Sequence, residues 1–149
     1  MKKVELFTDG ACKGNPGAGG WCAVLKYKEK ERILSGGETD TTNNRMELIA
    51  VIKGLSALKE SCEVSLYSDS SYVINSASKG WAKNWKAKGW KKSDNKPALN
   101  TDLWEEFLLL SEKHEIQYIW IKGHDGHSEN EFCDRKAVEE SEKFAKMIK

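Results

Sequence analysis

The sequence of 149 residues carries 24 basic and 23 acidic residues, a formal net charge of +1, and its length predicts one compact domain over residues 1–149. The near-neutral balance excludes binding to nucleic acid through overall charge, so any such affinity must come from local clusters. Because no apolar run approaches the roughly 20 residues of a membrane span and the four cysteines form no CxxC pair, we expect a cytoplasmic protein with reduced thiols, no membrane partner and no structural zinc.

The first predicted element is a strand over residues 4–9, which ends on a carboxylate. Residues 4–8 are largely β-branched or aromatic, and Asp9 is followed by a glycine-rich stretch over residues 10–20 that predicts a turn. An acid at a strand end beside glycines lies where a large ligand can reach it, so Asp9 is a candidate for chemistry. The alternative is that Asp9 only starts the turn by bonding its own backbone.

Two further strands and a helix follow. Residues 21–27 and 31–35 predict strands that complete an antiparallel meander, which Gly36-Gly37 is expected to end. A polar loop over residues 39–44 then leads into a helix over residues 45–58, in which apolar residues recur at helical spacing.

The next strand repeats the pattern of the first, because residues 64–69 alternate and end on Asp69. A helix between two strands implies a right-handed crossover, so this strand should lie parallel to the first and present Asp69 at the same sheet edge as Asp9. Residues 70–78 predict a short helix with a serine start signal.

Residues 79–100 form a segment that we call the basic protrusion. Seven lysines fall between residues 79 and 96, interleaved with Trp81, Trp85 and Trp90. Cationic side chains among aromatic rings favour a sugar-phosphate backbone, through counterion release and stacking. For Trp81 and Trp85 the alternative is that they anchor a solvated helix to the core.

The remaining elements are a helix over residues 102–110, a strand over residues 116–122 and a last helix. The strand is apolar on both alternations, which predicts cover on both of its faces. His114 is assigned to the ordinary surface. Between this strand and the last helix lies a loop with His124 and His127, where an imidazole can move a proton; one of the two is expected to be structural.

Four acids therefore begin or follow regular elements: Asp9, Glu47, Asp69 and Asp134. Clustering them costs free energy unless a cation is present, and hard divalent metals such as Mg²⁺ prefer carboxylate ligands. Two such ions about 4 Å apart can hold an attacking water and a leaving oxygen across a phosphodiester. The alternatives are a capping box between Asn44 and Glu47, and helix caps at Asp69 and Asp134.

In their order and spacing, several motifs together with the basic protrusion resemble the bacterial ribonuclease H1 family. These motifs are Thr8-Asp9-Gly10, Gly14-Asn15-Pro16-Gly17, Thr42-Asn43-Asn44-Arg45-Met46-Glu47, Ser68-Asp69-Ser70 and Gly123-His124-x-Gly126-His127-x-Glu129-Asn130-x-x-Cys133-Asp134. The resemblance covers about residues 4–137. It implies the α/β ribonuclease H-like fold, with a five-stranded mixed sheet of three antiparallel and then two parallel strands, and helices on both faces.

The resemblance also implies an endoribonuclease that cleaves the RNA strand of RNA/DNA hybrids, leaving 5′-phosphate and 3′-hydroxyl ends. Asp9 would bridge two Mg²⁺ ions (or Mn²⁺), Asp134 would help the ion that activates water, and Glu47 with Asp69 would hold the ion beside the leaving oxygen. His124 matches the loop histidine of the family, thought to assist proton transfer or product departure. We expect a monomer.

Other positions are expected to contact the substrate. Gly10, Cys12, Asn15, Asn43 and Asn44 match positions that follow the minor groove, where 2′-hydroxyls are displayed. Thr42 falls at a contact to a DNA phosphate. In the basic protrusion the expected contacts are Trp81, Trp85, Lys86, Lys88, Lys91 and Lys92.

The sequence departs from the family pattern at two places. Ser71 stands where close bacterial relatives commonly have a Gln that touches the substrate, so this contact is expected to be shorter or lost. Arg135-Lys136 replaces a more apolar pair, which puts the docking of the last helix in question. Two rival functions stay open: a non-catalytic module that binds hybrids or double-stranded RNA, and a DNA nuclease of the same superfamily, such as a resolvase or integrase core. Intact acids at four positions favour the nuclease over the binder, since concentrated negative charge repels polyanions.

Overall fold

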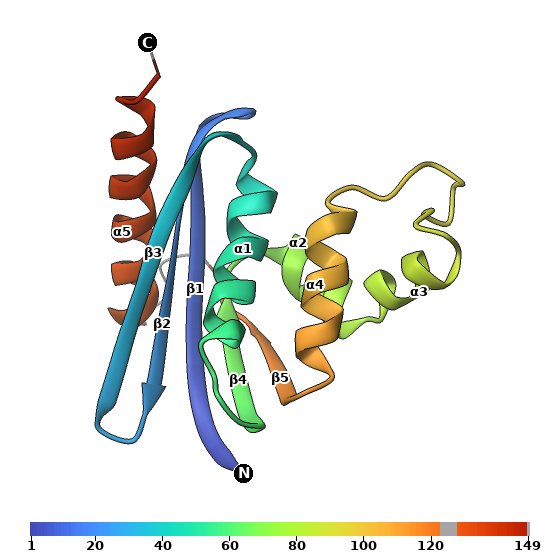
Figure 1. The fold of residues 1–149 in the computed structure, drawn as a ribbon, viewed down its shortest axis with the longest axis horizontal. Helices are drawn as coiled ribbons and strands as arrows, with labels where there is room; N and C mark the ends of the chain where they lie inside the picture. The colour runs from blue at the N-terminus through green and yellow to red at the C-terminus, as the bar shows by residue number, and fades with distance from the viewer. Residues whose placement is uncertain (123–127, 149) are drawn as a thin grey trace.

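The computed structural model describes residues 1–122 and 128–148, which contain a five-stranded mixed sheet in the order β3-β2-β1-β4-β5 (Figure 1). β1 pairs antiparallel with β2, and β2 antiparallel with β3, whereas β1, β4 and β5 run parallel. The predicted sheet is therefore confirmed. The strands are β1 Lys2–Gly14, β2 Gly17–Tyr27, β3 Lys30–Thr41, β4 Cys62–Ser68 and β5 Glu115–Trp120.

Helices cover both faces of the sheet, as expected. α5 packs along β1, β2 and β3 on one face, while α1 lies on the other face against β1 and β2, with α4 beside it (Figure 1). α3 stands at the side of the molecule away from α5. The helices are α1 Asn43–Ser56, α2 Ser71–Ser78, α3 Trp81–Ala87, α4 Thr101–Ser111 and α5 Ser128–Ala145.

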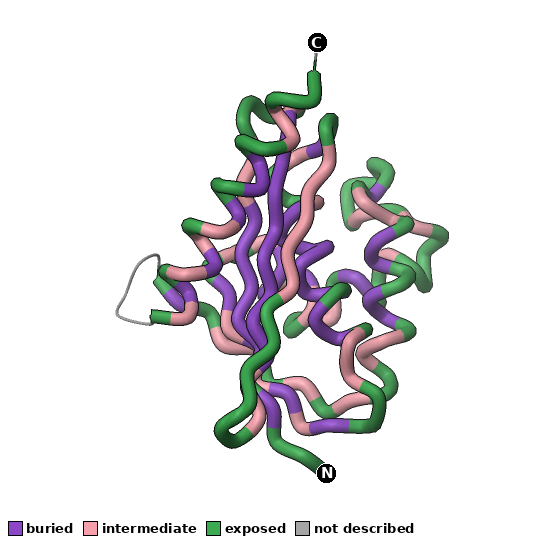
Figure 2. The backbone as a smooth tube through the Cα atoms, turned by 60° about the vertical axis from the view of Figure 1, so that its left-hand side comes forward, coloured by how far each residue is buried: buried purple, intermediate pink, exposed green. Residues whose placement is uncertain are grey.

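The main core lies between the sheet and the α1 side. Leu6, Leu48, Leu66 and Trp104 are all fully buried there, and burying a side chain of this kind contributes about 1.5–3 kcal/mol. Figure 2 shows the central strands as the most buried part of the backbone. At Gly54, α1 approaches β1 so closely that an added Cβ would lie 2.5 Å from Leu6 Cδ1. The apolar residues that recur at helical spacing thus form the face of α1 that packs against the sheet.

The first three strands are longer than the sequence predicted. β1 continues through Asp9 to Gly14, so the turn lies at Asn15-Pro16 rather than directly after Asp9. β3 continues through Gly36-Gly37 to Thr41, so these glycines do not end the meander and residues 39–41 are not a loop. A Cβ on Gly37 would lie 2.3 Å from Gly19 O and 2.7 Å from the Phe144 ring. The glycines therefore make room for α5 and the neighbouring strand.

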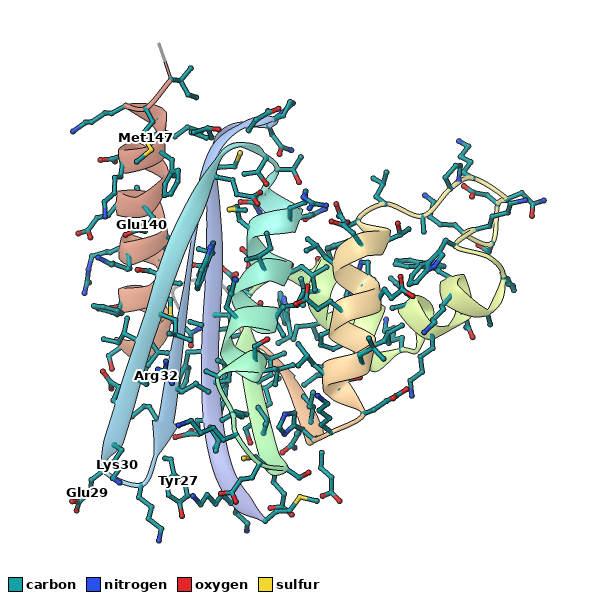
Figure 3. All side chains as sticks on the ribbon, viewed as in Figure 1. Tyr27, Glu29, Lys30, Arg32, Glu140 and Met147 are labelled. Atoms are coloured by element: carbon teal, nitrogen blue, oxygen red, sulfur yellow. The ribbon has the colours of Figure 1, made fainter. Side chains whose placement is uncertain are left out.

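The turn between β2 and β3 lies at the opposite end of the sheet from the C-terminus. Figure 3 shows Tyr27, Glu29 and Lys30 gathered there. The ammonium groups of Lys2 and Lys28 lie 5.2 and 5.3 Å from the centre of the Tyr27 ring. This end of the sheet therefore carries charged side chains, and two lysines make cation–π contacts with the Tyr27 ring.

Two predictions, one about β5 and one about His114 directly before it, were wrong. β5 is not covered on both faces: it is an edge strand, its residues are exposed or half-buried, and α5 packs instead on β1, β2 and β3. His114 is not an ordinary surface residue, because its Nδ1 accepts a hydrogen bond from Cys62 N at 3.1 Å and so ties the turn after α4 to the start of β4. Burial lowers the pKa of His114.

The last helix docks in spite of its unusual Arg135-Lys136 pair. Cys133 and Ala137 are fully buried against the sheet, whereas Arg135 is exposed. Lys136 pairs with neighbouring acids of the same helix, Glu139 at 3.6 Å and Glu140 at 3.8 Å. Within the described ranges, the chain has no helix that is both long and apolar enough to span a membrane.

Candidate active site

Three of the four predicted acids come together in the structure. Single carboxylate oxygens of Asp9, Glu47 and Asp69 all lie within 4.8 Å of one another. They come from β1, from α1 and from the residue after β4. Asp9 and Glu47 are buried, and Asp69 is exposed, so the group is open to solvent on one side.

Asp9 lies in the middle of β1, not at its end. The parallel pairing of β1 with β4 stops at Phe7 and Tyr67, whereas the pairing with β2 continues and sets Asp9 opposite Cys22. Asp9 therefore lies two residues beyond the last β1 residue that pairs with β4, and Asp69 lies directly after the end of β4. Gly10 N donates to Asp9 Oδ1 at 2.8 Å. The alternative that Asp9 starts a turn is wrong, because it lies within a strand.

Glu47 lies in the second turn of α1, and its side chain faces the sheet. The cap of this helix is Thr42, whose Oγ1 accepts a hydrogen bond from Arg45 N at 3.3 Å, so the proposed capping box between Asn44 and Glu47 is wrong. A Cβ on residue 10 would lie only 2.5 Å from Glu47 N. Glycine at this position is what lets α1 lie against β1 and bring Glu47 to Asp9.

Asp69 does not cap the helix that follows it, since Ser70 does so through a hydrogen bond from Val73 N to its Oγ at 3.2 Å. The backbone around Asp69 is held by neighbours on both sides. Ser70 N donates to Ser68 Oγ at 3.0 Å, and the indole of Trp120 donates to Asp69 O at 3.2 Å. Sequence reasoning missed this support, because only the parallel pairing of β4 and β5 brings Trp120 there.

The acid group is electrostatically strained without a cation. Burial, together with the charges of Asp69 and Asp134, raises the pKa of Asp9 to about 7. Burial and the charge of Asp9 raise the pKa of Glu47 well above its ordinary range. Among the described residues Glu47 Oε2 has no hydrogen-bond partner although it is buried.

This arrangement fits a hard divalent cation. The donors are all carboxylate oxygens, which suit Mg²⁺ or Mn²⁺ rather than the softer metals that prefer sulfur or imidazole. A bound cation would offset the repulsion between the acids and give the unpartnered Glu47 oxygen a ligand. The residues present therefore suit the ion that the sequence predicted.

Asp134 lies in the second turn of α5 and is half-buried. Because it lies inside the helix, it is not a cap. Its charge is near enough to raise the pKa of Asp9, yet it is not among the three acids whose oxygens lie within 4.8 Å. Cys133, beside it, donates from Sγ to Phe7 O at 3.4 Å and joins α5 to β1. His124 and His127 fall outside the described residues.

The residues expected to follow the minor groove lie together at one end of β1 and α1. Asn43 N donates to Asn15 Oδ1 at 3.0 Å, which joins the β1–β2 turn to the start of α1. Cys12 Sγ lies 3.4 Å from Thr41 O. Cys12 and Thr42 are half-buried, and Asn15, Asn43 and Asn44 are exposed. Gly10 is buried beneath α1.

The basic protrusion has an exposed and an anchored part. Lys86, Lys88 and Lys91 are exposed, and Lys92 is half-buried. The two tryptophans differ: Trp85 packs edge-on against Trp104 at 6.2 Å, whereas Trp81 is 42% exposed beneath the Lys79 ammonium. Trp85 is thus a core anchor, and Trp81 presents its ring at the surface.

Comparisons with known proteins show the family to which the chain belongs. The family model described as RNase H matches residues 1–142. A protein of Desulforamulus reducens named ribonuclease H is 56% identical over 138 residues, covering 93% of this chain and 87% of that protein. A ribonuclease H of Thermus thermophilus is 52% identical over 145 residues, covering 97% of this chain and 87% of the other.

Solved structures have the same fold. LC9-RNase H1, described as a type 1 RNase H with the type 2 active-site motif, superposes with a TM-score of 0.84 at 28% identity, over 96% of this chain and 74% of that one. LC11-RNase H1 in complex with an RNA/DNA hybrid superposes with a TM-score of 0.71 at 20% identity, over 94% of this chain and 97% of that one, a likeness of fold. The chain therefore belongs to the ribonuclease H family and is an enzyme of that family.

Proposed function

We propose that this enzyme hydrolyses the RNA strand of RNA/DNA hybrids and leaves 5′-phosphate and 3′-hydroxyl ends. The observation that carries the proposal is the group of three carboxylates on β1, α1 and the end of β4, with oxygens within 4.8 Å of one another. The names of the relatives and the hybrid bound by LC11-RNase H1 support the substrate class.

The cofactor proposed is Mg²⁺, with Mn²⁺ as a substitute, held as two ions by Asp9, Glu47, Asp69 and Asp134. When bound, such ions activate a water and stabilise the leaving 3′ oxygen of the phosphodiester. Asp9 is central because Glu47, Asp69 and Asp134 all act on its pKa. Glu47 with Asp69 would hold the ion beside the leaving oxygen, and Asp134 would help to hold the ion that activates water.

The chain's own residues bind and orient the duplex. We assign the RNA strand to the surface made by Cys12, Asn15, Asn43 and Asn44, above the buried Gly10, because their amide, thiol and backbone groups suit 2′-hydroxyls. Thr42 is assigned to a DNA phosphate. The exposed lysines of the basic protrusion, with Trp81, are assigned to the DNA strand, since this cationic surface suits phosphates. His124 is proposed to move a proton or to aid product departure.

We propose that residues 1–149 act as one ribonuclease H domain, as a monomer in the cytoplasm. Free thiols support this compartment, because the described cysteines form no disulfide. Ser71 is exposed at the start of α2, and because serine is shorter than the Gln that the family resemblance leads us to expect there, its contact with the substrate is proposed to be shorter or lost.

The test is a cleavage assay on four labelled substrates: RNA/DNA hybrid, single-stranded RNA, double-stranded RNA and double-stranded DNA. We expect only the hybrid to be cut, only in its RNA strand, and new ends that a 5′-phosphate-dependent exonuclease accepts. Binding of the hybrid without cleavage in Mg²⁺ or Mn²⁺ would favour the non-catalytic module. Cleavage of double-stranded DNA would favour the resolvase-like nuclease.

A further inference from the structure

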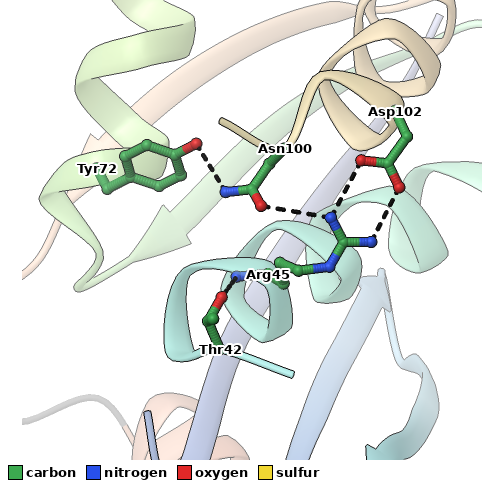
Figure 4. Close-up of polar contacts among 5 residues, drawn as sticks. All are labelled: Thr42, Arg45, Tyr72, Asn100 and Asp102. Atoms are coloured by element: carbon green, nitrogen blue, oxygen red, sulfur yellow. Dashed lines mark hydrogen bonds and ion pairs between the residues drawn. The ribbon is translucent and has the colours of Figure 1, made fainter. Parts of the chain in front are cut away.

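One arginine connects three helices at the start of α1. Arg45 in α1 donates from both terminal nitrogens to Asp102 in α4, at 3.0 and 2.9 Å, and from one of them to Asn100 Oδ1 at 3.3 Å (Figure 4). Asn100 Nδ2 in turn donates to the Tyr72 hydroxyl of α2 at 3.1 Å, which also accepts from the Trp104 indole at 2.8 Å. We call Arg45, Tyr72, Asn100 and Asp102 the arginine clamp.

Asn100 breaks a local rule in order to join the clamp. It is the residue that precedes α4, where an asparagine side chain normally accepts a hydrogen bond from the first turn, yet it makes no such cap. Its backbone is in the left-handed region, with φ of 59°, which asparagine tolerates better than most residues. A side chain diverted from capping in this way is typical of a functional position.

The clamp lies where the basic protrusion rejoins the body. The protrusion leaves after α2 and ends at Asn100, and the bond from Asn100 to Tyr72 ties this C-terminal end to the start of α2. Arg45 ties the same C-terminal end to the first turn of α1, next to Thr42 and Asn44. The two surfaces assigned to the duplex are thus joined through one guanidinium.

The charge of Arg45 is already engaged within the protein. The contact with Asp102 is bidentate, the geometry in which an arginine–carboxylate pair is most specific. The Arg45 side chain is 28% exposed and that of Asp102 is 64% exposed, and even a bidentate pair this open to solvent is a small part of the free energy of folding. Substitutions here should therefore leave the protein folded.

We propose that Arg45 is a positioning residue, which holds the basic protrusion at a fixed place relative to the start of α1 so that both bind one duplex. The inference rests on the proposed function, because it concerns hybrid binding. It separates Arg45 from the lysines of the protrusion, which are assigned direct phosphate contacts.

The test uses matched single substitutions. Arg45→Gln and Asp102→Asn break the clamp from either side, while Lys26→Gln and Glu129→Gln break a comparable ion pair, 2.9 Å long, between β2 and α5. Hybrid affinity should fall on the order of tenfold in both clamp variants, the effect of losing one charge-assisted hydrogen bond. This loss of affinity should raise KM and leave kcat unchanged, and the two control variants should bind as the parent does.

The direction in which Asp102→Asn changes hybrid affinity separates positioning from a simple effect of charge. Removing a negative charge strengthens binding to a polyanion if charge alone matters, or if Asp102 merely withholds Arg45 from a phosphate. Positioning requires the opposite, weaker binding, and the same loss in Arg45→Lys, since lysine cannot make the bidentate contact. Tighter binding by Asp102→Asn, or parent-like binding by Arg45→Lys, would overturn the proposal.

A second readout needs no substrate. Lys92 N donates to Lys96 O and Ala98 N to Trp90 O, both at 2.9 Å, inside the protrusion. Their amide hydrogen exchange, followed by NMR in the free protein, should be faster in the clamp variants and unchanged in the controls. Unchanged exchange in the clamp variants would refute the positioning role. If the parent failed to bind the hybrid, the proposed function would fall and the role in binding with it, while exchange would still report whether the clamp holds the protrusion.

Discussion

Replacing Asp9 with asparagine should abolish cleavage and at the same time stabilise the metal-free protein. The substitution keeps the shape of the side chain and removes one charge from a group of three acids, two of which are buried. Cleavage in Mg²⁺ should fall by about a thousandfold or more, since several kcal/mol of transition-state stabilisation depend on the ions that Asp9 is proposed to share. Hybrid binding should persist.

The size of the stabilisation follows from the pKa of Asp9. A rise from 3.8 to about 7 corresponds to about 4 kcal/mol against the charged form, which is an upper limit for the gain from asparagine. Since the folded-state pKa is raised, the parent loses stability as the pH rises from about 4 to about 7 and then stays level. The gain should therefore be absent near pH 4 and full near pH 8.

The assay is urea unfolding in chelator at three pH values between 4.5 and 8, with Glu105→Gln as the control. Glu105 is an exposed acid of α4, so its substitution removes the same charge without touching the group. Adding Mg²⁺ at pH 8 should stabilise the parent and the control but not Asp9→Asn. An Asp9→Asn variant that cleaves well, or that is less stable than the parent at pH 8 without metal, would refute the reasoning.

Three further predictions concern substrate binding and stability. Changing four lysines together to glutamine should weaken hybrid binding and flatten its dependence on salt, and an unchanged slope would count against the basic protrusion; these are Lys86, Lys88, Lys91 and Lys92. Gly20→Ala should lower the free energy of unfolding by at least about 1–3 kcal/mol in urea, because its Cβ would lie 2.2 Å from Ala137 O in α5; a parent-like midpoint would contradict this packing. His114→Gln should flatten the pH dependence of stability between pH 7 and 5, because a lowered histidine pKa makes the parent lose stability as the pH falls through 6.5; unaltered curves would show that His114 is not responsible.

The residues alone predicted the antiparallel meander and a further strand parallel to the first, because these depend on regular signals, whereas the five-stranded sheet followed from the resemblance to the family. The helical spacing of α1 and the crossover rule were enough to place Asp69 beside Asp9. Where the predictions failed, a tertiary contact overrode a local pattern. Gly36-Gly37 was interpreted as a strand end. In the structure, the missing side chain at Gly37 leaves room for Phe144 of α5 and for Gly19 of the neighbouring strand.

The supporting residues of the site had no sequence signal of their own. Trp120 reaches Asp69 O, and His114 reaches Cys62 N, only because β5 lies next to β4. The arginine clamp joins Arg45 to Asp102 across 57 positions of the chain. Single-sequence patterns report neighbours along a helix or strand, and such distant side-chain pairs are not among them.

The most direct test of the account is cleavage of one RNA/DNA hybrid, labelled differently on its two strands, with Mg²⁺ and then with excess chelator. The account predicts that the RNA strand is cut in Mg²⁺, that the DNA strand stays intact, and that chelator stops the reaction. Cleavage that continues in chelator, or that cuts the DNA strand, would contradict the role given to Asp9, Glu47 and Asp69.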